Sequence, residues 1–152
     1  IVKEAMVLFK QKAQGVVEFA LVLPLFLLLI IGTIYFGMAF SDYLAINNAV
    51  RSIAHEASMG QSVVEYRKAV VNNTKDMKLV SDIFTWQPDR ASGYNNVYLT
   101  VNFDNMSRSV VVVARPVFNK DSAIGNAFCN LAGQDIGDGI NIRYSMYSDV
   151  RR

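Results

Sequence analysis

The chain has 152 residues, 52% of them hydrophobic, and its mean hydropathy of +0.22 is high for a soluble domain. The formal net charge of +2 is too small to indicate a nucleic-acid-binding surface. The single cysteine, Cys129, excludes an internal disulfide, and with His55 as the only histidine it fits no zinc-ligand spacing. The length predicts one compact domain plus an additional helix.

An apolar run near the N-terminus is the most distinctive segment. It carries no charge between Glu18 and Asp42, and residues 19–41 would span roughly 35 Å as a helix, enough to cross the hydrocarbon core of a bilayer. A cleaved secretory signal is the competing interpretation, but its apolar core is usually about 7 to 15 residues long and ends in a small-residue site. We therefore predict a membrane-spanning or filament-core helix at 19–41.

The charges on either side of this run predict its orientation. Lys3, Lys10 and Lys12 precede it against Glu4 alone, whereas the first basic residue after it is Arg51. Positively charged flanks tend to remain in the cytoplasm. The N-terminus is therefore expected inside the cell and the bulk of the chain outside it.

Helical spacing of apolar residues extends on both sides of the run, up to Gly60. The sequence thus predicts one helix over 1–59. Pro24 removes a backbone donor and crowds the preceding turn, so a kink or a locally opened stretch is expected from Ala20 to Pro24.

Residues 60–152 are predicted to form a small extracytoplasmic head of mixed helix and strand. The expected elements are an amphipathic helix at 61–73, a strand at 79–86, a hairpin with strands at 97–103 and 109–114, a short helix at 124–131 and a last strand at 140–146. The predicted fold class is α+β, with a long N-terminal hydrophobic helix carrying an antiparallel sheet of three or four strands and a short helix.

Glu18 is the candidate functional residue that elementary chemistry singles out. A carboxylate at the edge of hydrocarbon costs on the order of several kcal/mol unless it is protonated, hydrated or paired. A cation on a neighbouring copy, such as a free α-amino group, Lys10 or Lys12, would attract it, and this pairing would set the axial offset between copies. The alternative is that Glu18 reaches the headgroup level of a single-pass anchor.

The same segment contains a longer pattern, namely Gln14-Gly15-Val16-Val17-Glu18-Phe19-Ala20-Leu21-Val22-Leu23-Pro24, then leucines and isoleucines, Gly32 and Tyr35-Phe36-Gly37. Over Gln14 to Phe40, roughly a sixth of the chain, this pattern resembles the N-terminal region of TadE-like proteins. Those are pilin-like or pseudopilin components of the tight-adherence branch of type IV pili.

The resemblance implies a role for individual positions. In that family the glutamate is fifth in the mature chain, just after a prepilin-peptidase cut, so Glu18 would be that acid if the cut fell between Ala13 and Gln14. The family usually has glycine before the cut, and Ala13 departs from that pattern. Three possibilities are left open: a retained leader, a cut before Ile1, or a sequence that simply starts at Ile1.

Together these features predict a structural subunit, pilin or pseudopilin, of a type IV or Tad-like extracellular filament, held together by hydrophobic N-terminal helices that include Phe19 and Pro24. The implied partners are further copies of the chain, the cytoplasmic membrane before assembly, prepilin peptidase and the pilus assembly machinery. The implied location is the cell surface, with a precursor in the inner membrane. The alternative is a monomeric, single-pass, membrane-anchored binding or accessory protein of a secretion or adhesion machine.

Other patterns have simpler explanations. Asp135 and Asp138 lack the spacing of an EF-hand Ca²⁺ loop and indicate a glycine-rich turn. His55 is expected on the polar face of the helix, and Cys129 as a small buried apolar residue. The tyrosines expected to pack on the sheet rather than form an adhesion patch are Tyr94, Tyr98, Tyr144 and Tyr147. We predict no catalysis, cofactor, metal or nucleic-acid partner.

Overall fold

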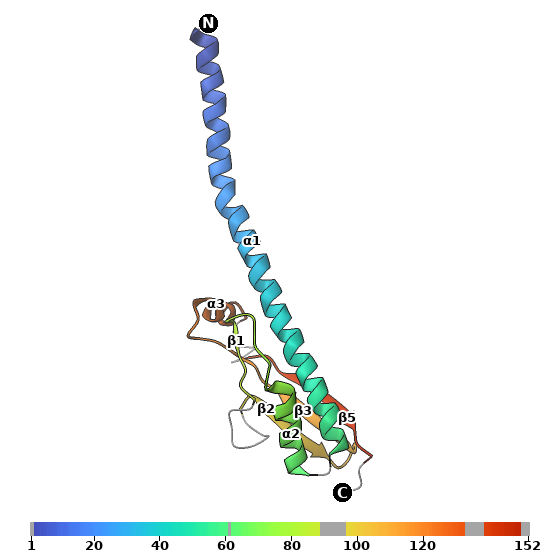
Figure 1. Cartoon of the computed structure of the whole chain (residues 1–152). Coiled ribbons are helices and arrows are strands. Elements are labelled where there is room, and N and C mark those ends of the chain that lie inside the picture. Colours follow the sequence, from blue (N-terminus) through green and yellow to red (C-terminus); the bar gives the residue numbers. More distant parts are fainter. Residues whose placement is uncertain (1, 61, 89–96, 133–138, 150–152) are drawn as a thin grey trace. The chain divides into compact units, whose positions relative to one another are not determined.

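The computed structural model describes residues 2–60, 62–88, 97–132 and 139–149, and the side chains among these from residue 14 onwards. In chain order the elements are α1 (Val2–Met59), α2 (Val63–Thr74), β1 (Phe84–Thr85), β2 (Leu99–Asp104), β3 (Ser109–Ala114), β4 (Val117–Phe118), α3 (Ala123–Ala132) and β5 (Ile142–Tyr147) (Figure 1). The predicted α+β class is confirmed.

The chain forms two compact units, residues 1–37 and residues 38–152. Their boundary lies inside α1. The part of α1 from Met38 onwards belongs to the second unit. The predicted division into a helix up to Met59 and a head after it stays a prediction.

The long N-terminal helix is confirmed and ends where Gly60 was expected to stop it. The Gly60 N–H donates to the carbonyl of Ala57 at 3.1 Å, which satisfies one of the last backbone acceptors of α1. α1 continues through Pro24 without interruption, although a proline has no N–H to donate to the carbonyl one turn back. The kink stays a prediction.

The core of the second unit lies on one face of a three-stranded antiparallel sheet with the order β2-β3-β5. The register pairs Val101 with Val112, and Val112 with Tyr144. Since side chains alternate across a strand, this register aligns a set of buried residues on a single face. That set is Leu99, Val101, Val110, Val112, Ala114 and Ile142.

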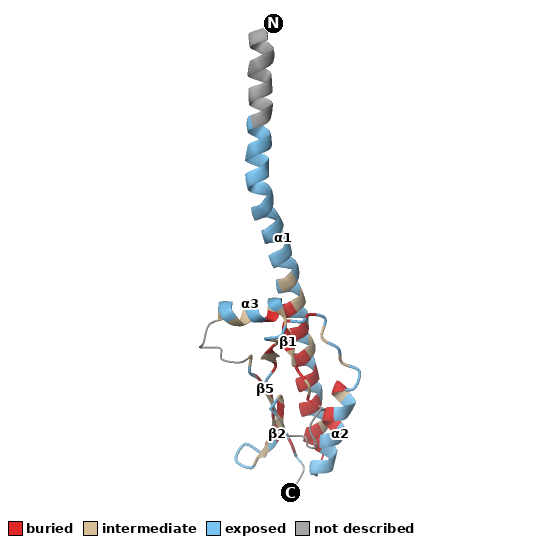
Figure 2. Cartoon of the chain, turned by 90° about the vertical axis from the view of Figure 1, so that its left-hand side faces the viewer, coloured by how far each residue is buried: buried red, intermediate tan, exposed pale blue. Residues whose placement is uncertain are grey.

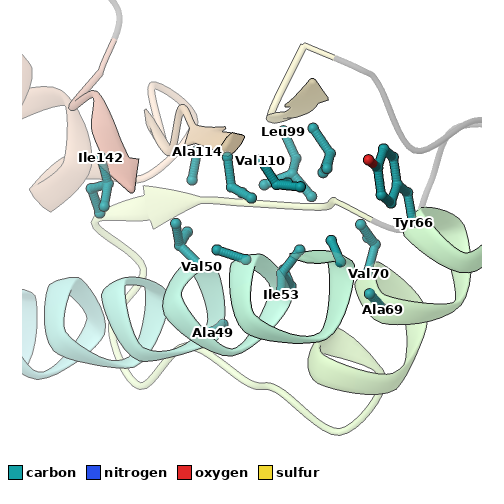
Figure 3. Packing of buried hydrophobic residues seen from close by; sticks show 14 of the residues in the cluster. Ala49, Val50, Ile53, Tyr66, Ala69, Val70, Leu99, Val110, Ala114 and Ile142 are labelled. Carbon is teal, nitrogen blue, oxygen red and sulfur yellow. The ribbon is translucent and has the colours of Figure 1, made fainter. Parts of the chain in front are cut away.

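α1 covers this face with a buried stripe at helical spacing. The stripe comprises Ile46, Ala49, Val50, Ile53, Ala54 and Ala57, each at most 8% exposed. Figure 3 shows Val50 and Ile53 pointing towards the sheet residues Ala114 and Val110, with Val70 of α2 completing the layer. Burying each large apolar side chain contributes on the order of 1.5–3 kcal/mol, so this stripe ties α1 to the sheet.

α2 begins at Val63 rather than at residue 61, because Ser62 takes the N-cap position. The Ser62 hydroxyl accepts from the Glu65 N–H at 3.4 Å, and the Glu65 carboxylate accepts from the Ser62 N–H at 2.9 Å. This reciprocal pair is a capping box, which satisfies two backbone donors at the start of the helix. At its other end, the Asn72 and Asn73 side-chain amides donate to Glu56 of α1 at 2.8 and 2.7 Å.

The hairpin, the short helix and the last strand are confirmed with small shifts in their bounds. β2 starts at Leu99 rather than at residue 97, α3 is one residue longer at each end than expected, and β5 covers 142–147 rather than 140–146. In the hairpin turn, the Ser107 hydroxyl and the Met106 N–H donate to Asp104 and lower the pKa of its carboxyl group.

The strand predicted at 79–86 is largely wrong. Only Phe84 and Thr85 form a strand, β1, and it pairs with β4, an element that was not expected. Facing each other across this small sheet, the rings of Phe84 and Phe118 lie 5.3 Å apart. The residues before β1 are not in a ladder because their backbone donors are engaged by a side chain of α1.

That side chain is Asp42, which is 1% exposed. One carboxylate oxygen accepts from the N–H of Val80 at 2.6 Å, and the other accepts from the N–H of Ser81 at 2.9 Å and from the Ser81 hydroxyl. Hydrogen bonds to an ionised acceptor are stronger than those between neutral groups. We call this set of contacts the Asp42 clamp, and it fixes the segment before β1 against α1.

We predict that Asp42→Asn lowers the free energy of unfolding by about 1–3 kcal/mol, because its amide N–H₂ would face donors and leave a buried N–H unpaired. The measurement is a urea titration of the full chain in detergent, followed by the fluorescence of Trp86, the only tryptophan. Asp82→Asn, an exposed acid on the same segment, is the matched control and should change stability by less than about 0.5 kcal/mol. Equal urea midpoints for the two variants would contradict the clamp.

Candidate assembly surface

The first unit exposes apolar side chains on all sides of α1. Phe19, Leu21 and Leu28 are 66%, 74% and 69% exposed, and the exposed large side chains continue to Phe36. Figure 2 shows this part of α1 as exposed, with buried positions appearing only further along the helix. A continuous apolar surface of this kind is not stable in water and requires lipid or other protein as its neighbour.

α1 is long and apolar enough to cross a membrane, as judged by length and composition. Within Gln14–Met59 its most apolar 18-residue window has a mean hydropathy of 2.6 and is 0% buried. A core helix of a soluble protein passes the same test of hydropathy but is covered by its own chain, which this window is not. The apolar run is therefore an uncovered surface whose length and composition suit membrane anchoring, and its retention rather than removal as a signal stays a prediction.

Cover by the chain itself begins within the last residues of the apolar run. Ala39 and Asp42 are the first buried residues of α1, while Phe40 between them is still 54% exposed. One side of the helix thus joins the head at this level and the other side stays apolar and uncovered.

Glu18 lies at the N-terminal edge of the exposed surface. The side-chain amide of Gln14 donates to one of its carboxylate oxygens at 3.1 Å, a contact one helical turn apart. Within the described part of the chain, no ion pair involving Glu18 is found, so its charge is available to a cation from elsewhere. The contact with Gln14 holds the carboxylate beside α1 without neutralising it.

The other predicted assembly residues divide into two groups. Phe19 and Pro24 lie on the exposed surface of α1. Lys10, Lys12 and Ala13 belong to the same helix, but their side chains lie outside the described part of the structure. The structure therefore brings Gln14 and Glu18 together and leaves the pairing of Glu18 with a lysine as a prediction.

The described residues of the head form no candidate site comparable to Glu18 and the exposed apolar surface of α1. His55 is exposed, as expected for the polar face of α1, and it borders a shallow groove of about 600 Å³ with Arg51 and Tyr144. The described residues include no cluster of three or more His, Cys, Asp and Glu side chains that could hold a metal. Asp135 and Asp138 lie outside the described residues.

The lone cysteine and the tyrosines have ordinary structural roles. Cys129 is half-buried on α3 and packs against an apolar cluster. Tyr98 and Tyr144 pack against the core as expected, whereas Tyr147 is 59% exposed, and Tyr94 lies outside the described residues. Sequence analysis missed Asp42, whose only signal was its position as the first charge after the apolar run.

Comparison with known proteins gives a match that lies within α1. Residues 13–55 match the family model described as TadE-like protein. This segment is similar to TadE-like proteins. The match spans the motif around Glu18, the exposed apolar surface and most of the buried stripe of α1. No curated protein and no solved structure matches the chain.

We predict that an acid in the middle of the TadE-like segment prevents membrane integration. Leu28→Asp should cost about 2.5–3.5 kcal/mol of insertion free energy, because a charge near the centre of a membrane helix is poorly solvated. The measurement is the fraction of chain that resists alkaline extraction from membranes. Val64→Asp, at a head position that is similarly exposed at 63%, is the control and should leave that fraction unchanged. Equal extraction of the two variants would refute the membrane assignment.

Proposed function

We propose that the chain is a structural subunit of a Tad-type extracellular pilus, assembled by packing the apolar parts of α1 from many copies. The observation that carries this proposal is the uncovered apolar surface of α1, with a TadE-like match over the same residues. That surface needs an apolar neighbour both before and after assembly. In the membrane the partner is lipid, and in the filament it is the same surface of other copies.

Burying this surface again keeps the filament together once it is outside the bilayer. Each apolar side chain of the Val or Leu size would lose about 1.5–3 kcal/mol if it moved from the packed interior into water. A contact between one face of a helix and a different face of the next copy does not close on itself and therefore extends into a helical filament. The head stays folded throughout, since its core is formed by its own residues.

Glu18 sets the stagger between copies in this proposal. If its partner is the α-amino group of a chain that starts at Gln14, the axial offset is four residues, or roughly 6 Å. Lys12 and Lys10 on the next copy correspond to roughly 9 and 12 Å. Helical reconstruction of filaments would therefore identify the partner from the axial rise between neighbouring subunits in contact.

We predict that Glu18→Gln lowers filament yield at least about tenfold while leaving membrane integration intact, because loss of a buried partner costs more than about 1.4 kcal/mol. Filament yield is measured as sheared surface protein relative to the total membrane-bound chain. Asp76→Asn, an exposed acid of the head, is the matched control and should assemble normally.

The outcome that would reject a filament subunit is purified surface filaments that lack this chain. A monodisperse complex of one chain with detergent, and no detergent-resistant polymer, would favour the alternative of a monomeric membrane-anchored accessory protein. Such a protein would keep α1 permanently in lipid, and Glu18→Gln would then affect neither extraction nor surface protein.

We further propose that a prepilin peptidase cuts between Ala13 and Gln14, which makes Glu18 the fifth residue of the mature chain. Mass spectrometry of the N-terminal peptide from filaments should identify a peptide that begins at Gln14. Replacing Gln14 by proline should block the cut, because proline restricts the backbone at the scissile bond. Filament-derived peptides that span Ala13 and Gln14 intact would exclude cleavage at this bond.

A further inference from the structure

Two short segments of the head satisfy the acceptor pattern for N-linked glycosylation, which is asparagine, any residue except proline, then serine or threonine. They are Asn72-Asn73-Thr74 at the end of α2 and Asn105-Met106-Ser107 in the turn between β2 and β3. A pattern this short also occurs by chance, so the structure around each segment has to discriminate between them. A usable acceptor presents both its asparagine amide and its hydroxyl to the same enzyme.

The segment at the end of α2 does not present both groups while α2 is folded. Residues two apart project roughly 200° from each other around a helix and so do not face the same side. Asn72 is exposed, but its amide donates to Glu56 of α1 at 2.8 Å. Thr74 is 6% exposed, and its hydroxyl donates to the carbonyl of Val70 at 2.7 Å. Modification of Asn72 would therefore require the last turn of α2 to unfold.

The segment in the hairpin turn is open at all three residues. Asn105, Met106 and Ser107 are exposed, and Met106 reaches 98%. Among the described residues, the Asn105 side chain makes no hydrogen bond, so its amide is available. The Ser107 hydroxyl donates to the carboxylate of Asp104 at 2.7 Å and lies 2.6 Å from the hydroxyl of Ser109. The bond to Asp104 is exposed, so water or an enzyme can replace it at small cost.

The turn is also held in place by the rest of the head. Arg108 closes it with a φ of 49°, in the left-handed region that a non-glycine residue seldom adopts. The Arg108 carbonyl accepts from the N–H of Ser148 at 2.9 Å, and the Ser148 hydroxyl donates to the carbonyl of Ser58 in α1. The folded head therefore presents Asn105 on a fixed turn rather than on a long loop.

We propose that Asn105 is a glycosylation site of the folded head, with a glycan carried on a lipid diphosphate as the donor. The Asn105 Nδ2 forms a bond to the anomeric carbon of the sugar and loses one proton. The bond between that carbon and the phosphate oxygen breaks, and the lipid diphosphate leaves. Ser107 supplies the hydroxyl by which the enzyme recognises the acceptor. A glycan is bulky and solubilising, which an exposed turn accommodates without disturbing the core.

The proposal rests on the proposed location of the head outside the cytoplasm. It does not depend on filament formation, because a filament subunit and a membrane-anchored monomer would present the same turn. The two hypotheses can therefore fail separately.

The experiment is mass spectrometry of the full chain isolated from the cells that make it, both intact and as peptides that cover the two segments. We expect a sugar mass on the peptide that contains Asn105 and an unmodified peptide that contains Asn72. Asn105→Gln should remove the sugar mass from the intact chain, whereas the matched control Asn72→Gln should retain it. Circular dichroism verifies that each variant is folded.

Two variants of Ser107 test the recognition step without touching the acceptor. Ser107→Ala should lower the modified fraction at Asn105 at least about tenfold, because the pattern requires a hydroxyl. Ser107→Thr should restore it. A purely structural role of the turn would not produce this difference, since both variants leave the asparagine amide in place.

An unmodified Asn105 in the chain from these cells would overturn the proposal, and normal filament yield would then leave the proposed subunit role intact. A glycan on Asn72 would also overturn it, because transfer would then precede the folding of α2 and the folded structure would not select the site. Surface filaments that lack the chain would reject the subunit role, while peptides of the membrane-bound chain would still decide whether Asn105 carries a glycan.

Discussion

Apolar side chains of α1 need two different kinds of neighbour, and this requirement organises the whole chain. From Gln14 to Gly37 the described side chains of the helix are largely exposed, so this part of the helix needs lipid or other protein as its neighbour. From Ala39 onwards one stripe of the same helix is buried under the sheet and α2. A single continuous helix thus supplies both the surface that must find a partner and the scaffold on which the head folds.

Polar contacts join the head to α1 where the exposed part of the helix gives way to the buried part. Asp42 is the first charge after the apolar run and accepts hydrogen bonds from Val80 and Ser81. It therefore attaches the head where the apolar run ends and cover by the chain itself begins. Further along, Glu56 accepts from both asparagines of α2, and the Ser148 hydroxyl donates to the carbonyl of Ser58 at 2.6 Å. The head is therefore joined to α1 at several levels along the helix.

Glu18 and Asp42 are carboxylates at the two ends of the same apolar run, and their surroundings assign them different roles. Asp42 is satisfied inside its own chain, whereas Glu18 is exposed and receives one hydrogen bond, from Gln14. A satisfied buried acid stabilises a fold, whereas an exposed acid beside an apolar surface is available to a cation from elsewhere. This contrast is the structural reason to look for assembly chemistry at Glu18 rather than in the head.

The sequence by itself determined the long helix and its end, the hairpin, α3 and the TadE-like character of the first part, because these depend on local periodicity, turn residues and one uninterrupted apolar run. It also singled out Glu18, since a lone charge in such a run is visible without coordinates. Only the tertiary structure decided that Val80 and Ser81 donate to Asp42 rather than to a neighbouring strand, that β4 pairs with β1, and that α3 packs beside Ala39. Those features depend on contacts between residues far apart in the chain, and no local pattern encodes which distant donor a buried carboxylate will meet.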